Sequence, residues 1–202
     1  LVTGATGSGK STSIAAMINE INKTRKENII TIEDPIEFIH KDQESIISQR
    51  EIGKDANTFH GALRAALRED PDVILVGELR DVETIGMALT AAETGHLIFG
   101  TLHTSGAPNT VHRIIDVFPA GQQAQVRTQL SQSLKMVLSQ RLFPKSDNSG
   151  RVAAFEVMIN NAAIANLIRE NKIEQMMSVI QTAHQEGMTT MEKSIENLTG
   201  IK

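Results

Sequence analysis

The sequence predicts an α/β fold with a mostly parallel β-sheet. Strand-like and helix-like stretches alternate along the 202 residues, as they do when helices connect parallel strands. The run Val73–Val76 is apolar without interruption, which is typical of a strand buried on both faces. Near the start, a glycine-rich turn separates strand-like residues from a helical pattern, an arrangement that suits phosphate binding.

The glycine-rich turn at residues 4–11 reads GATGSGKS and fits the phosphate-loop pattern G-x-x-x-x-G-K-[ST]. Its glycines allow tight turns that aim backbone N–H groups at phosphate oxygens. Lys10 supplies positive charge for the β- and γ-phosphates, and the Ser11 hydroxyl is suited to ligate Mg²⁺. We therefore expect a nucleoside triphosphate and Mg²⁺ as cofactors; the resemblance described below implies that the nucleotide is ATP. The residues expected to bind the nucleotide are Gly4, Ala5, Thr6, Gly7, Ser8, Gly9, Lys10, Ser11 and Thr12.

The spacing of apolar residues predicts the elements that follow the loop. Helices are expected from Ser11 onward, over residues 58–68 and 85–92, and over a longer segment with Val126, Leu130, Leu134, Val137 and Leu138 on one face. Strands are expected over residues 29–32, 73–76 and 97–102. The polar segment KSDNSG at 145–150 predicts a turn or short linker. We expect a core over residues 1–157 and a small C-terminal helical region over 158–202.

The composition excludes several classes of protein. Hydrophobic residues make up 40% of the chain, enough for one substantial core, and no apolar run approaches the length of a membrane span. The absence of cysteine excludes a cysteine-ligated zinc module and fits a reducing cytosol. A net charge of −4 and 3% aromatic residues argue against direct nucleic-acid binding. The chain begins without Met, directly before the loop, and we expect it to be a fragment.

An acidic residue follows the apolar run Val73–Val76, although one position later than usual. Phosphate-loop enzymes commonly place a metal-side acid at the end of such a strand. Here the strand is followed by Gly77 and then Glu78. We expect Glu78 to reach Mg²⁺ through a water and to act together with Ser11; a surface glutamate at a strand end is the alternative.

A second acidic cluster follows the predicted strand at 29–32. The sequence EDPIE places Glu33, Asp34 and Glu37 there. Ligands bind outside the carboxyl ends of strands in open α/β sheets, so one of these carboxylates is expected to orient or deprotonate an attacking water. The chemistry of the residues does not choose between Glu33 and Glu37 as the group that acts on the water. The other interpretation is that these carboxylates are only charged, solvated side chains of a loop.

Two histidines flank the predicted strand in TGHLIFGTLHT. His96 and His103 lie seven positions apart on an extended run and point in different directions, which argues against a shared metal site. His103 follows the strand and is placed to sense the nucleotide state by hydrogen bonding. A structural role is the alternative for His103, and it is favoured for His96.

Taken together, these segments resemble the secretion ATPase superfamily, the motors of type II and type IV secretion and of type IV pili. TIEDPIEF at 31–38 resembles its Asp box, DPDVILVGELRD at 70–81 its variant Walker B, and TAAETGHLIFGTLHT at 90–104 its His box. The resemblance extends along essentially the whole chain and is closest to the PilT-type pilus retraction ATPases. AIANLIRE at 163–170 is similar to their AIRNLIRE motif, with Ala165 in place of arginine.

The resemblance implies roles that spacing left open. It implies a RecA-like P-loop NTPase core in which Glu37 is the catalytic base, Glu78 the Walker B glutamate and His103 the second His-box histidine, with Glu33 kept as a further catalytic candidate. It also implies a homo-hexameric ring. A PAS-like N-terminal domain is expected upstream, and arginines from it complete the nucleotide site.

The function implied by the resemblance is an ATP-hydrolysing motor subunit that powers type IV pilus retraction and twitching motility. The expected location is cytoplasmic, at the inner-membrane face of the pilus machine. The expected partner is the pilus platform protein, through which force reaches pilin indirectly. Alternatives are an accessory retraction ATPase, an extension or secretion ATPase, an inactive regulator and a RecA-like nucleic-acid motor. Extension and secretion ATPases of the family commonly carry a zinc-binding insertion with four cysteines. This sequence has no cysteine, which favours a retraction ATPase.

Overall fold

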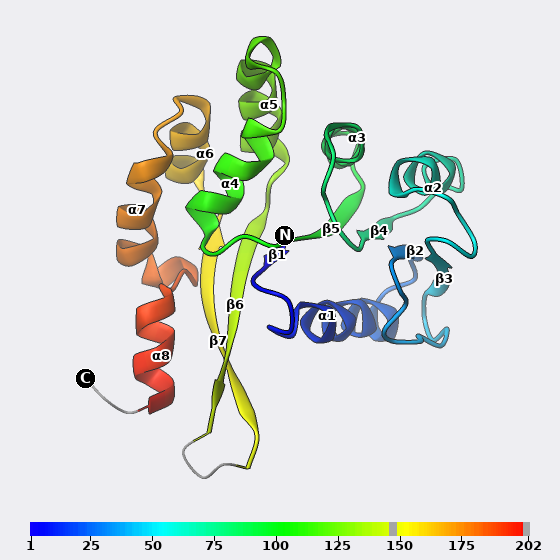
Figure 1. Ribbon diagram of the computed structural model, residues 1–202, viewed down its shortest axis with the longest axis horizontal. Helices are drawn as coiled ribbons and strands as arrows, with labels where there is room; N and C mark the ends of the chain where they lie inside the picture. Colours follow the sequence, from blue (N-terminus) through cyan, green and yellow to red (C-terminus); the bar gives the residue numbers. More distant parts are fainter. Residues whose placement is uncertain (146–148, 200–202) are drawn as a thin grey trace. The chain divides into compact units, whose positions relative to one another are not determined.

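The computed structural model describes residues 1–145 and 149–199 (Figure 1). Its chain forms two compact units, one comprising Ser11–Thr101 and the other Leu1–Lys10 with Leu102–Lys202. Within the described residues, no helix has the length and apolar character needed to cross a bilayer. Residues 146–148 of the expected polar turn lie outside the described part. The boundary expected between residues 157 and 158 stays a prediction.

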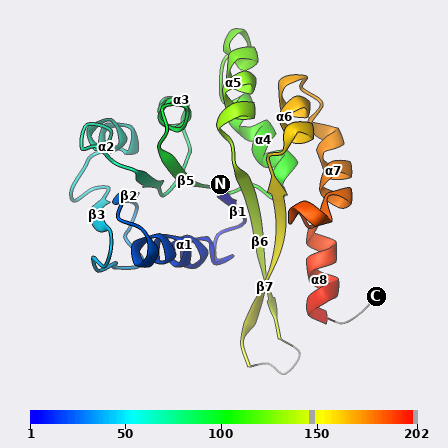
Figure 2. The same cartoon turned by 180° about the vertical axis from the view of Figure 1, so that it is seen from behind.

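The unit Ser11–Thr101 is built on four parallel strands in the order β3-β2-β4-β5. In Figures 1 and 2, α1 covers one face of these strands and α2 and α3 cover the other. The strand bounds are β2 Asn28–Glu33, β3 Ile46–Glu51, β4 Val73–Val76 and β5 Leu97–Leu102. The helix bounds are α1 Lys10–Thr24, α2 Phe59–Ala66 and α3 Val82–Glu93.

The strands predicted at 29–32, 73–76 and 97–102 are confirmed as β2, β4 and β5. Ile30 and Ile74 are paired across β2 and β4 and are at most 1% exposed, as expected for strands covered on both faces. The helix predicted at 58–68 is confirmed as α2. It begins after Thr58, whose hydroxyl accepts a hydrogen bond from the N–H of Gly61 at 3.0 Å.

The second unit contains β1, β6 and β7 and most of the remaining helices. The strand β1 (Val2–Thr3) pairs in parallel with β6 (Met136–Pro144), which forms a long antiparallel pair with β7 (Arg151–Ile159). Helix α4 packs on β6 and β7, α5 on α6, and α8 on β7 (Figure 2). The helix bounds are α4 Ala107–Asp116, α5 Ala120–Ser133, α6 Ala162–Arg169, α7 Met176–Thr182 and α8 Met191–Thr199, with 3₁₀ turns at Ile173–Gln175 and His184–Glu186.

The prediction of a long helix that includes Val137 and Leu138 is wrong at the C-terminal end of the helix. Helix α5 ends at Ser133, Leu134 has extended backbone angles, and Val137 and Leu138 belong to β6. Leu138 is paired with Val2 of β1, so sheet hydrogen bonds replace the helical ones there. A short run of apolar residues satisfies both periodicities, and tertiary pairing decides between them. The chain also contains β3 and α4, which the apolar spacing did not predict.

The segment AIANLIRE forms α6, and its N-terminus is capped by one of the two asparagines that precede it. The Asn161 side chain accepts a hydrogen bond from the N–H of Ile164 at 3.0 Å. Asn160 instead donates to the carbonyl oxygens of Ser131 and Leu134 at the end of α5. Ile164 and Ile168 are fully buried, so the apolar face of this helix packs into the core.

The N-terminus of α4 is held by side chains from two strands, because Gly106 before it has no side chain to cap it. Ala107 N–H donates to the Glu156 carboxylate of β7 at 2.6 Å. Gly106 N–H donates to the Ser139 hydroxyl of β6 at 3.0 Å, and Ser139 is hydrogen-bonded to Thr3 of β1 at 2.6 Å. Glu156 is only 4% exposed. Burial raises its pKa above the ordinary 4.5, against the lowering effect of the Ala107 N–H.

The buried carboxyl predicts a pH-dependent contribution to stability. Because its folded-state pKa is raised, the contribution of Glu156 is fully present below the ordinary pKa and is lost as pH rises through the folded-state pKa. Glu156→Gln cannot titrate but retains an acceptor for Ala107 N–H. We therefore expect the stability of the variant relative to the wild type to be higher at about pH 7.5 than at about pH 4, measured by urea unfolding. An equal difference at both pH values would contradict this.

Candidate functional site

The phosphate loop connects β1 to α1 and lies against β6. Gly4, Gly7 and Gly9 have φ angles of 145°, 75° and 87°, which side-chain-bearing residues rarely adopt. A Cβ atom at Gly4 would meet the Gln140 carbonyl oxygen of β6, and one at Gly9 would lie 2.7 Å from the Gln140 side-chain nitrogen. A Cβ at Gly7 would meet nothing within 4 Å in the described part of the chain. The loop is therefore tight against β6 and open at Gly7.

Two polar groups are buried within the loop. The Lys10 ammonium donates to the carbonyl oxygens of Gly4 at 2.8 Å and Ala5 at 3.0 Å. The Ser8 hydroxyl is buried and has no hydrogen-bond partner among the described residues. A buried cation and an unsatisfied hydroxyl, on a loop at a helix N-terminus, suit the oxygens of a phosphate group.

His103 lies beside this loop. Gly4 N–H donates to the carbonyl oxygen of Leu102 at 3.3 Å, and Thr6 Oγ1 lies 3.5 Å from His103 Nδ1. His96 is held within its own turn, with Nδ1 at 2.9 Å from the carbonyl oxygen of Ala91. The structure therefore brings His103, and not His96, to the phosphate loop.

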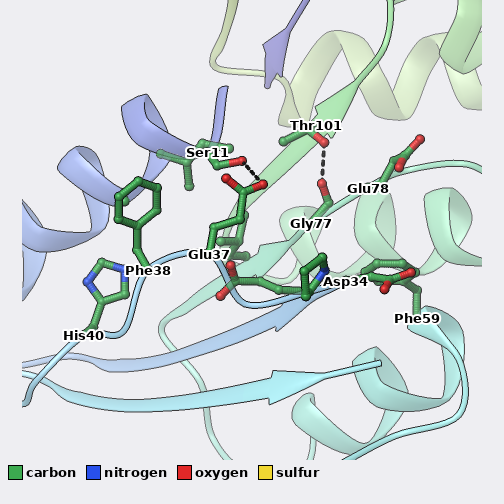
Figure 3. Close-up of a pocket in the computed structure, with 14 residues that line it drawn as sticks. Ser11, Asp34, Glu37, Phe38, His40, Phe59, Gly77, Glu78 and Thr101 are labelled. Atoms are coloured by element: carbon green, nitrogen blue, oxygen red, sulfur yellow. Dashed lines mark hydrogen bonds between the residues drawn. The ribbon is translucent and has the colours of Figure 1, made fainter. Parts of the chain in front are cut away.

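The predicted carboxylates gather around one pocket in the unit Ser11–Thr101 (Figure 3). The pocket has a volume of about 80 Å³, enough for several waters. Ser11, Glu33, Glu37, Glu78 and Thr101 all contribute to its lining. The Ser11 hydroxyl donates to Glu37 Oε1 at 2.9 Å, so the candidate metal ligand and one candidate base are in direct contact.

Glu33 and Glu37 have different partners. Glu33 is the last residue of β2, and its Oε1 accepts hydrogen bonds from Thr31 Oγ1 at 2.7 Å and from Gln49 Nε2 at 3.3 Å. Glu37 lies on the segment after β2, and its carboxylate faces Ser11 at the N-terminus of α1 (Figure 3). Glu33 is thus hydrogen-bonded within its own sheet, whereas Glu37 contacts the N-terminus of α1, where the phosphate-loop motif ends.

Glu78 reaches the pocket because the strand ends come unusually close. Gly77 N–H donates to the carbonyl oxygen of Ile32 at 2.7 Å. A Cβ at Gly77 would lie 3.0 Å from that oxygen and 3.2 Å from the Cα of Glu33, so glycine permits this approach. The Thr101 hydroxyl donates to the Gly77 carbonyl oxygen from the other side. Gly77 places Glu78 one position later than the usual acid, and it also allows the close approach that brings Glu78 to the pocket.

Arg80 is paired with the pocket residue Glu78 and was not singled out by the sequence patterns. Its Nη2 lies 2.5 Å from Glu78 Oε2, and this ion pair raises the pKa of the arginine. The available signal was the i, i+2 spacing in GELRD, because alternate residues of an extended segment project to the same side.

The oxygen ligands at this pocket fit Mg²⁺. Ser11 offers a hydroxyl and Glu78 a carboxylate, both of the hard oxygen type that this ion prefers. Among residues 1–145 and 149–199, no three His, Cys, Asp or Glu side chains are grouped as a metal site. Mg²⁺ is usually held through one or two protein oxygens together with substrate phosphates, and Ser11 and Glu78 supply two such oxygens.

Comparison with known proteins places these features in a family. A family model described as "Type II/IV secretion system protein" matches residues 1–200. The chain belongs to this family. The predicted resemblance to secretion ATPases is confirmed, as is the α/β fold with its mostly parallel strand pairing.

Three similar proteins define the place of the chain within the family. It is 62% identical to the "Twitching motility protein" of Neisseria gonorrhoeae, over 98% of this chain and 53% of that protein. It is 57% identical to the "Type IV pilus retractation ATPase PilT" of Pseudomonas aeruginosa, over 98% of this chain and 57% of that protein. A crystal structure of the pilus retraction motor PilT with bound ADP is similar with a TM-score of 0.85 and 56% identity, over 96% and 59% of the two chains. The chain thus spans about half the length of these relatives.

The loop geometry predicts different costs for two alanine substitutions. Gly4→Ala combines a forbidden φ with a collision against the Gln140 backbone, whereas Gly7→Ala has the unfavourable φ alone. We expect Gly7→Ala to lower the free energy of unfolding by about 1 kcal/mol and Gly4→Ala by about 3 kcal/mol or more. Urea unfolding of both variants tests this, and equal losses would show that β6 does not restrict the loop.

Proposed function

We propose that this chain is the ATP-hydrolysing part of a homo-hexameric motor that powers type IV pilus retraction and twitching motility. The observation that carries the proposal is the hydrogen bond between Ser11 and Glu37, which joins the end of the phosphate-loop motif to a carboxylate able to act on water. The names of the relatives from Neisseria gonorrhoeae and Pseudomonas aeruginosa support retraction rather than secretion.

In this proposal residues 4–12 bind ATP. Backbone N–H groups of the loop and the Lys10 ammonium bind the β- and γ-phosphates, and the open side at Gly7 admits them. Ser11 would hold Mg²⁺ directly and Glu78 would hold it through a water. The ion would supply positive charge that stabilises the negative charge developing on the phosphates.

Glu37 is the proposed catalytic base. It accepts a proton from a water as the water oxygen attacks the γ-phosphorus. The bond from the γ-phosphorus to the β,γ-bridging oxygen breaks, and ADP and phosphate are released. Glu33 is proposed to support this base from the end of β2, where Thr31 and Gln49 hold it. His103, beside Thr6, is proposed to sense the γ-phosphate by hydrogen bonding.

The assembly and its partners are part of the same proposal. A PAS-like domain upstream supplies arginines to the nucleotide site, residues 1–157 act as the RecA-like core, and residues 158–202 as a helical appendage. The ring works in the cytoplasm at the inner-membrane face, where the platform protein receives the force and transmits it to pilin. Direct nucleic-acid binding is not expected, given the net charge of −4.

An accessory retraction ATPase is the second candidate, because Ala165 replaces the arginine of the retraction motif in α6. The complete natural protein, expressed alone in a strain without its own retraction ATPases, separates the two functions. Restored retraction supports a primary motor, and restoration only beside a second ATPase supports the accessory role.

Removal of the phosphate-loop ammonium should abolish catalysis. Lys10→Ala is expected to reduce ATP turnover by about 100-fold or more, because no other loop side chain supplies the positive charge that stabilises the transferring phosphoryl group. Steady-state ATPase assays of the complete natural protein measure this, with circular dichroism to verify folding. Lys23→Ala, an exposed lysine in the last turn of the same helix, is the matched control. Near-normal turnover in Lys10→Ala would refute the proposed ATPase.

The proposal predicts that substitution of the two candidate bases has unequal effects on ATP turnover. Glu37→Gln is expected to bind ATP with unchanged affinity and to reduce turnover by about 100-fold or more, because an amide cannot accept the proton. Glu33→Gln is expected to retain most of the activity, and Glu44→Gln, exposed between β2 and β3, serves as the control. Turnover and nucleotide binding are measured on the same samples. The reverse order of effects would assign the base to Glu33.

A further inference from the structure

The segment that carries Glu37 is anchored to the edge strand β3 by one side chain. Gln49 of β3 accepts a hydrogen bond from His40 N–H at 2.8 Å through Oε1. Its Nε2 donates to the carbonyl oxygen of Phe38 at 2.9 Å and to Glu33 Oε1 at 3.3 Å. A single amide therefore contacts the backbone after Glu37 and the other carboxylate of the same acidic cluster.

The two backbone contacts follow a specific pattern. In a parallel sheet, one residue bonds the carbonyl before and the N–H after the residue that it faces. The Gln49 side chain takes the carbonyl of Phe38 and the N–H of His40, so it bonds the chain around Ile39 as a residue of a parallel strand would. The amide has both the donor and the acceptor that this requires.

Apolar burial contributes little to holding Ile39, which is 87% exposed. Phe38 is 40% exposed and lines the pocket together with Ile14 and Ala15. At Ile39 itself the backbone is held on both sides by the hydrogen bonds to Gln49. Loss of the amide would therefore release the backbone directly after Glu37.

A second anchor from the same strand holds the other side of Glu37. Ile36 N–H donates to Glu51 Oε2 at 3.1 Å. Glu51 is two residues from Gln49, so both side chains project to the same side of β3. Hydrogen bonds from Lys54 and from the Ile36 N–H lower the pKa of Glu51, so it is ionised and a strong acceptor. Residues 36 and 38 are thus both tied to β3, with Glu37 between them.

We infer that Gln49 is a positioning residue, which holds the Glu37 carboxylate toward Ser11 by fixing the backbone on its C-terminal side. This inference rests on the proposed function, in which Glu37 prepares the attacking water. Gln49 itself touches no reacting atom. Its loss leaves residues 4–12 in place, so nucleotide binding is retained while the base is misplaced.

The test compares Gln49→Met with the wild type in the complete natural protein. Methionine has a similar length and no amide. We expect kcat to fall by about 10- to 100-fold, because misplacement of a catalytic group by about 1 Å has effects of that size, while KM and ATP affinity stay within about twofold. Ser48→Ala, at an exposed position next to Gln49 on β3, is the matched control and should leave kcat unchanged.

Two further measurements distinguish positioning from general destabilisation. Gln49→Met added to Glu37→Gln should cause no further loss of kcat, because the two residues act through one carboxylate. Hydrogen exchange of the His40 amide should be faster in Gln49→Met and unchanged in Ser48→Ala, because only the first removes its acceptor.

Three outcomes would overturn the inference. These are a wild-type kcat in Gln49→Met, a full additional loss in the Glu37→Gln background, and an unchanged exchange rate at His40. Failure of the proposed function has a different signature, since the unmodified protein would then bind ATP without hydrolysing it.

Discussion

Parallel pairing between β2 and β4 determines where the acidic groups lie. Ile32 is opposite Val76 in the register, so the residues that follow each strand leave the sheet at the same edge. Glu33 follows Ile32, and Gly77 with Glu78 follows Val76. A shift of one residue would move every side chain of a strand to the opposite face. Side chains on both faces of these strands are closely packed, with Ile32 and Val76 fully buried, so a shift would require both faces to repack. In this way the core fixes the geometry of the pocket.

The pocket itself is held mainly by polar contacts. Beyond β2 the chain follows an exposed path on which Ile39 is unburied, and Gln49 and Glu51 supply the restraint. Polar anchors of this kind fix a backbone with few apolar contacts. Residues held in this way have lower local stability than a core strand.

The predictable parts of the structure are those in which local chemistry and burial agree. The runs that became β2 and β4 are apolar and end at an acidic residue or a glycine, and the run that became β5 lies between His96 and His103. The sequence alone indicated all three. The strand β3 was not predicted because, after Ile46 and Ile47, it continues with the polar residues Ser48 to Glu51 and lies at an edge. Helix α4 had a usable signal in Pro108 near its start. Val137 and Leu138 fit either periodicity, and only pairing with β1 and β7 decided for a strand.

The site was predictable as a set of residues but not as a set of contacts. The sequence spacing predicted that Glu33 and Glu37 lie at the same edge of the sheet. It could not choose between them as the base, because spacing does not reveal hydrogen-bond partners. The structure separates them through Thr31 and Gln49 on one side and Ser11 on the other. Gln49 belongs to no recognised motif and lies 12 positions after Glu37 in the sequence. Its contacts with the backbone next to Glu37 are therefore visible only in the tertiary structure.

The contact between Ser11 and Glu37 is compatible with both roles proposed for the serine. A hydroxyl has one O–H bond and two lone pairs, so its oxygen can ligate a cation while its proton stays directed at a carboxylate. A cation on that oxygen would make the O–H a stronger donor and so strengthen its hydrogen bond to Glu37. Occupation of the metal position would then orient the base. Glu78 differs, because its carboxylate is already paired with Arg80, and one oxygen must leave that pair or share it with a water. The shared hydroxyl therefore couples the proposed metal position to the proposed base, and this is the simplest link that the described contacts offer between the two.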